Sequence, residues 1–77
     1  MKVLYYANEM ERIVEDVKDY ISQCSTEEQN AYNAELARVE NNFVALVESG
    51  VFHDACGKTL NVFENWGQLC AEVETEY

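Results

Sequence analysis

The chain lacks proline altogether and has only three glycines in 77 residues. Without these residues, nothing in it resembles a flexible linker, a repeat or a low-complexity tract. No apolar run approaches the roughly 20 residues that span a bilayer. The opening MKVLYYANEM is interrupted by Asn8 and Glu9 and lacks the apolar core of a signal peptide. These absences favour one compact domain over residues 1–77, soluble and cytoplasmic.

Cysteine and basic residues are also scarce. Three cysteines, Cys24, Cys56 and Cys70, form an odd set without paired spacing, so we expect free thiols in a reducing compartment. Five basic residues face fifteen acidic ones, and the formal net charge is −10. Such a surface repels nucleic acid and anionic lipid and attracts basic proteins. We therefore expect no direct nucleic-acid binding and no membrane contact.

Apolar residues make up 48% of the chain, and their spacing predicts helices almost throughout. Steps of three and four run from Val3 to Cys24, and again from Tyr32 to Val47. Ser25, with Glu28 three residues later, is a candidate capping box for the second helix, and Gly50 is a candidate for its C-terminal cap. A third stripe has the same spacing and comprises Val62, Phe63, Trp66, Leu69, Cys70, Val73 and Tyr77.

The predicted fold is therefore all-α: a long antiparallel helical hairpin with a shorter third helix. Asp54 and Thr59 remain alternative N-caps for that third helix. The alternative fold is α+β, because VLYY and VETEY near the two termini also alternate with a period of two and could pair as strands. A long hairpin under a short helix leaves apolar surface uncovered, and a homodimer through it is an alternative arrangement.

No catalytic or cofactor motif is present. His53 and Cys56 stand three residues apart, a spacing compatible with a thiolate–imidazole pair, but neither this pair nor the scattered cysteines has the spacing of a known nucleophile or zinc site. The chain is also too short to leave much room for a substrate pocket. We expect a protein that is not an enzyme and holds no metal or cofactor.

The informative signal is a set of carboxylates in locally unfavourable places. Glu11, Glu15 and Asp19 recur every four residues, about 6 Å apart along a helix axis. Like charges at that spacing destabilise a helix. Three more, Glu72, Glu74 and Glu76, would crowd the negative end of the third helix. Local rules tend to be broken where function requires it, so these six are the predicted partner-binding residues.

Rows of fixed carboxylates resemble the phosphates of a nucleic acid, so the predicted partner is a larger protein with a basic surface. In size and charge balance alone, the chain is similar to phage- and plasmid-encoded inhibitors that act as DNA mimics, including anti-CRISPR and anti-restriction proteins. The alternatives are an immunity protein or antitoxin that neutralises a basic toxin, or a small assembly or adaptor module. For the adaptor, the candidate anchors are aromatic: Tyr5, Tyr32, Phe52 and Trp66.

Overall fold

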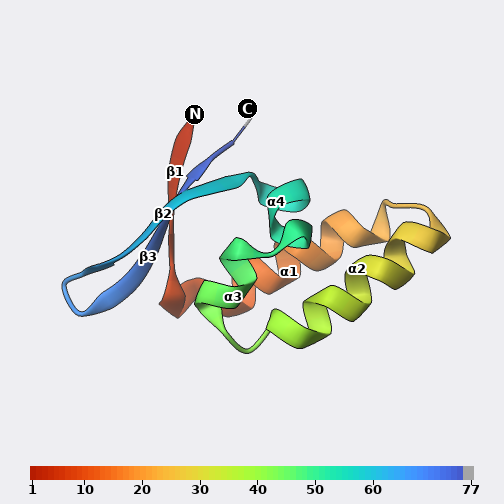
Figure 1. Ribbon diagram of the computed structural model, residues 1–77, viewed down its shortest axis with the longest axis horizontal. Coiled ribbons are helices and arrows are strands. Elements are labelled where there is room, and N and C mark those ends of the chain that lie inside the picture. The colour runs from red at the N-terminus through yellow and green to blue at the C-terminus, as the bar shows by residue number, and fades with distance from the viewer. Residues whose placement is uncertain (76–77) are drawn as a thin grey trace.

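The computed structural model describes residues 1–75 as an α+β fold in which helices cover one face of a small sheet (Figure 1). The all-α prediction is wrong. In chain order the elements are β1 (Lys2–Tyr6), a 3-10 turn η1 (Ala7–Glu9), α1 (Met10–Ser22), α2 (Thr26–Val39), α3 (Phe43–Glu48), α4 (Gly50–Cys56), β2 (Lys58–Asn65) and β3 (Gln68–Glu74). The predicted third helix is thus replaced by a β-hairpin.

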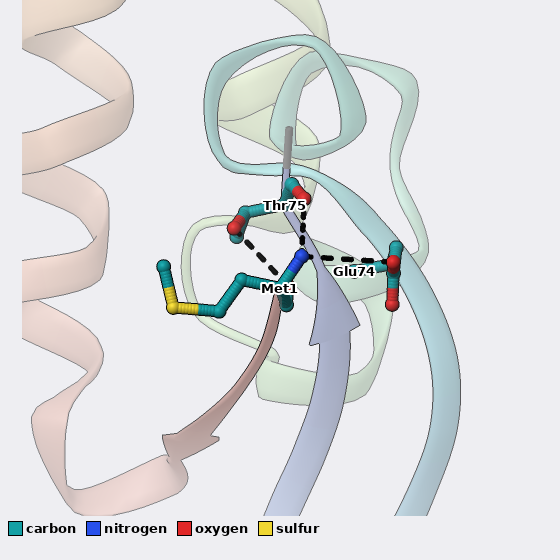
Figure 2. Close-up of polar contacts among 3 residues, drawn as sticks. All are labelled: Met1, Glu74 and Thr75. Atoms are coloured by element: carbon teal, nitrogen blue, oxygen red, sulfur yellow. Dashed lines mark hydrogen bonds and ion pairs between the residues drawn. The ribbon is translucent and has the colours of Figure 1, made fainter. Parts of the chain in front are cut away.

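The sheet is antiparallel and has the order β1–β3–β2, so the two ends of the chain pair with each other. The alternative α+β prediction is confirmed in this part, since Val3 pairs with Val73. Figure 2 shows how the pairing continues past the strands: the Met1 ammonium donates to the Thr75 carbonyl at 3.0 Å, and the Thr75 hydroxyl donates to the Met1 carbonyl at 3.2 Å. The Thr75 amide also donates to the Met1 carbonyl, at 2.8 Å. The Met1 ammonium also lies 3.7 Å from a carboxylate oxygen of Glu74.

The hairpin between β2 and β3 turns on two residues, Trp66 and Gly67. Their φ angles are 55° and 76°, as a type I′ turn requires. Glycine adopts such angles freely, whereas a bulky side chain does so at a cost of roughly 1–2 kcal/mol. The Trp66 side chain, which the helical pattern placed on an apolar stripe, is instead 97% exposed at the tip of the hairpin.

The helices α2, α3 and α4 begin where polar side chains cap them, whereas α1 has no side-chain cap. Ser25 and Glu28 form the predicted capping box at the start of α2. The predicted second helix does not reach Gly50, because Asn42 accepts a hydrogen bond from the Ala45 amide at 3.1 Å and starts α3. Ser49 caps α4, so neither Asp54 nor Thr59 is an N-cap. Gly50 therefore begins a helix and does not end one.

The core lies between the helices and the covered face of the sheet. α1 contributes Ile13, Val17 and Ile21, and α4 contributes Val51 and Phe52. Leu36, Phe43, Leu46, Val47, Cys56, Ala71 and Val73 complete the buried cluster. The aromatic ring of Tyr5, from β1, packs edge-on against that of Phe52, with their centroids 5.5 Å apart. Because the apolar stripe of α1 packs into this core, the charged face of the same helix points to solvent.

Candidate partner-binding surface

The acidic ridge, defined as Glu11, Glu15 and Asp19, lies on the solvent face of α1. All three side chains are exposed, and all three residues fall within the helix. Helical periodicity places them opposite the buried stripe of Ile13 and Val17. Half of the predicted partner-binding set is therefore one continuous row on a rigid element.

The ridge carries its negative charge without a partner among residues 1–75. Arg12, the nearest arginine in sequence, points elsewhere: it lies 2.9 Å from a carboxylate oxygen of Glu9 and 4.0 Å from one of Asp16. No ion pair within the described part of the chain includes Glu11, Glu15 or Asp19. Glu11, in the first turn, is favoured by the helix dipole, but Glu15 and Asp19 gain little from it.

A shallow groove borders the ridge, between α1 and the end of α2. Its apolar lining comes from Met10 and Val14, and the carboxylates of Glu11, Glu15 and Glu40 stand around it together with Arg12, Lys18 and Asn41. Long basic side chains combine an apolar stem with a charged head. A groove with apolar and acidic walls can hold both parts. Glu40 was not predicted as a site residue, because its place beside α1 depends on how α2 packs.

The other predicted carboxylates lie on a different surface. Strand alternation puts Glu72 and Glu74 on the face of the sheet turned away from the helices, since Ala71 and Val73 face the core. Glu74 is paired across the sheet with Lys2 on one side and Lys58 on the other. Glu74 also forms an ion pair with the Met1 ammonium, whereas no ion pair among residues 1–75 includes a carboxylate of the ridge. Because β3 is a strand, the predicted conflict with a helix dipole does not arise, and Glu76 lies outside the described residues.

The His53–Cys56 pair has no features of an activated nucleophile. Both residues lie on α4, where His53 is exposed and Cys56 is buried. Burial raises the pKa of the Cys56 thiol to about 11, which keeps it protonated at neutral pH. Cys24, Cys56 and Cys70 are free thiols. Within residues 1–75, no group of three or more His, Cys, Asp or Glu side chains is placed to hold a metal ion.

Of the four aromatic residues predicted as anchors, only Trp66 is exposed, whereas Tyr5 and Tyr32 are half-buried. Phe52 is completely buried, and Tyr5 packs against it. The Tyr32 hydroxyl donates to Asp54 at 2.6 Å, a hydrogen bond that raises the pKa of this tyrosine. The exposed hairpin tip was missed as a surface, because the helical spacing of residues 62–73 hid the two-residue turn.

Comparison of the chain with protein-family models, with curated proteins and with solved structures gives no match in any of the three. The inference of function therefore depends on the surface of this molecule alone. In the described part of the chain, no helix has the length and apolar character needed to cross a membrane.

Proposed function

We propose that this protein is a non-enzymatic binding protein that uses the acidic ridge of α1 to cover the basic, nucleic-acid-binding surface of a larger protein and so inhibits it. The observation that supports the proposal is the ridge itself: three exposed carboxylates in one row, without an ion-pair partner in residues 1–75. A surface of lysines and arginines built for phosphates offers such a row the same favourable contacts.

The charge around the ridge supports the same proposal. Between Glu9 and Cys56, the segment that forms the helices, eleven acidic side chains face three basic ones. This concentration of negative charge on one layer steers a basic partner toward the helices before contact. It also disfavours nucleic acid itself as the ligand. The proposed setting is the cytoplasm, where thiols such as the three free cysteines stay reduced.

The groove beside the ridge adds an apolar contact, which salt does not screen, to the charged one. A lysine or arginine from the partner would lay its methylene stem on Met10 and Val14 and its charged head among Glu11, Glu15 and Glu40. The ridge would then give speed and orientation of binding, and the groove would slow dissociation. A basic toxin would bind by the same contacts, which makes an immunity protein or antitoxin the alternative identity for the complex.

The test compares two variants of equal net charge. In the ridge variant, Glu11→Gln, Glu15→Gln and Asp19→Asn are combined; in the control, Glu27→Gln, Glu48→Gln and Glu64→Gln remove three exposed carboxylates elsewhere. Each protein is immobilised and used to capture partners from a lysate of the source cell. Duplex DNA is then added as a competitor, and the captured proteins are identified by mass spectrometry.

We expect the wild type and the control to capture the same protein, and the ridge variant to lose it by at least about tenfold, as the loss of charged contacts worth about 1.4 kcal/mol or more would give. Duplex DNA should displace the captured protein. Equal loss in both variants would show that only bulk charge matters. Capture of a DNA-bound protein that DNA does not displace would contradict the mimicry, and capture of a toxin would identify an antitoxin.

A further inference from the structure

The large hydrophobic side chains that stand exposed in the described chain are confined to the sheet layer. The five large hydrophobic side chains that stand exposed are Met1, Leu4, Leu60, Trp66 and Leu69. All of them belong to the strands, to the residue before β1 or to the turn of the hairpin, and none to a helix. The two layers therefore differ in chemistry: the helices carry most of the acidic side chains, and the sheet layer carries the large exposed hydrophobic ones.

Within residues 1–75, one face of this sheet has no helix over it (Figure 1). This open face is defined by three rows across the strands, which are Lys2–Glu74–Lys58, Leu4–Glu72–Asn61 and Tyr6–Cys70–Phe63. Cys70 has no solvent exposure, yet it is absent from the core cluster beneath the other face. It is buried on the open side, beside its cross-strand neighbours Tyr6 and Phe63. The open face is thus partly apolar already, and its centre is closely packed.

The charge of the open face fits a second copy of this chain better than any strongly charged partner. The face carries two lysines and two glutamates, which balance, whereas the helix segment carries a large excess of acid. Two copies of a protein with a net charge of −10 repel each other most strongly through their helices. Contact through the open faces places the two helix layers at opposite ends of the pair, where their repulsion is smallest.

The two ends of the open face differ, one being basic and the other aromatic, so they would complement each other if two copies stacked with their strands antiparallel. The row with Lys2 and Lys58 lies at one end of the face, and the row with Tyr6 and Phe63 lies toward the tip of the β2–β3 hairpin, which extends away from the helices (Figure 1). Trp66 is in the turn at that tip. When two such faces stack with their strands antiparallel, the tip of each lies over the lysine row of the other. An indole ring attracts an ammonium group held over its face.

We propose that two copies of this chain associate through the open faces of their sheets, in an antiparallel stack with twofold symmetry, so that Trp66 of each copy packs over Lys58 in the lysine row of the other. Leu4, Tyr6 and Phe63 form the apolar centre of the contact. The sheet edges stay clear of this contact, and the acidic ridge on α1 remains free for a different partner.

The size of the face makes this dimer a weak one. Three strands about 4.8 Å apart and about seven residues long cover roughly 14 by 24 Å, or about 340 Å². The Trp66 ring adds about 200 Å². The total for two copies is about 1,100 Å², at the lower end of specific interfaces. We therefore expect a dimer in exchange with monomer at roughly 10 µM to 1 mM of protein.

Sedimentation equilibrium over that concentration range, with the full chain and no other component, measures the association directly. Trp66 is the only tryptophan, so its fluorescence reports this site alone. Its emission should shift to shorter wavelength as the dimer forms and the ring leaves water. Added salt should strengthen the dimer, because it screens the repulsion between two acidic copies. Binding of a basic protein to the ridge has the opposite salt dependence, so failure of the two proposals is distinguishable.

A matched pair of variants tests the face. Leu4 is 41% exposed on the open face, and Leu69 is 38% exposed on the opposite side of the sheet. Leu4→Lys should weaken the dimer at least tenfold, while Leu69→Lys should change it less than twofold. Trp66→Asn, which suits a type I′ turn, should weaken it about fivefold without harming the fold. A monomer at 1 mM, equal effects of the two leucine variants, or a dimer weakened by salt would each overturn the proposal.

Discussion

The α carbon of Gly57 lies so close to the end of β3 that a Cβ atom on it would stand 2.4 Å from the carbonyl oxygen of Glu74. The φ angle of Gly57 is 134°, in a region that side chains rarely allow. Because Gly57 has no side chain, the chain can pass from α4 to β2 in close contact with the backbone of β3, the central strand. This contact couples the covered face of the sheet to the helix that carries Phe52.

Replacing Gly57 should therefore damage the fold. We expect Gly57→Ala to lower the free energy of unfolding by about 3 kcal/mol or more, because backbone strain and a clash with immovable backbone add together. Urea denaturation followed by circular dichroism measures it. The control is Gly67→Ala at the hairpin tip, where φ is also positive but no atom lies within 4 Å of the added Cβ. It should cost only about 1 kcal/mol, and equal losses would refute the close approach.

Replacing Trp66 should raise the free energy of unfolding, in contrast to replacing Gly57. The φ angle of Trp66, 55°, is unfavourable for a bulky side chain, and the Trp66 ring is almost fully exposed. Trp66→Asn creates the Asn-Gly pair that type I′ turns prefer. We expect a gain of about 1 kcal/mol in the free energy of unfolding, from urea denaturation at a dilution where the protein is monomeric. Trp66→Ala, which keeps the backbone strain, should gain less. A loss of stability with asparagine would mean that the ring packs within its own chain.

Stability should also depend on alkaline pH. Burial raises the pKa of Cys56 to about 11 and that of Tyr5 to about 12, in both cases above the ordinary values of 9.0 and 10.0. The folded state therefore holds these protons more tightly than the unfolded state. Their contribution to stability is fully present below pH 9 and is lost as the pH rises through 11 and 12.

Thermal unfolding from pH 7 to 11 checks this dependence. We expect a plateau followed by a decline in the melting temperature above pH 9. In the variant Tyr5→Phe, which keeps the aromatic packing on Phe52, the decline should be shallower. A flat profile in the wild type would contradict the burial of these two groups.

The first two thirds of the sequence predicted local structure better than the last third. The stripe of Ile13, Val17 and Ile21 gave the buried face of α1, and Ser25 with Glu28 gave the start of α2, since both features depend on neighbours in sequence. Asn42 divides the predicted second helix, and Ser49 caps a further helix where the second was expected to end. Both are local caps, but the apolar pattern outweighed them in the prediction.

The C-terminal hairpin was missed for two physical reasons. Val62, Phe63, Leu69, Cys70 and Val73 satisfy a helical spacing by coincidence, although within each strand the side chains alternate between faces. The turn also lacks the usual Asn-Gly signal, because Trp66 occupies its first position. The surroundings of Glu74 depended on strand register, which no local pattern contains: its neighbours Lys2 and Lys58 are far away in sequence. The ridge was predictable because one helix defines it.

The central claim is that the acidic ridge of α1 binds a partner and does not stabilise the fold. The direct measurement combines two readouts on the variant Glu11→Gln, Glu15→Gln, Asp19→Asn: the free energy of unfolding in urea, and capture of the basic partner at low and high salt. We predict a stability unchanged or higher by a few tenths of a kcal/mol, because repulsion between i and i+4 is relieved, together with loss of a capture that is salt-sensitive in the wild type. Capture that survives the three substitutions and ignores salt would contradict the claim.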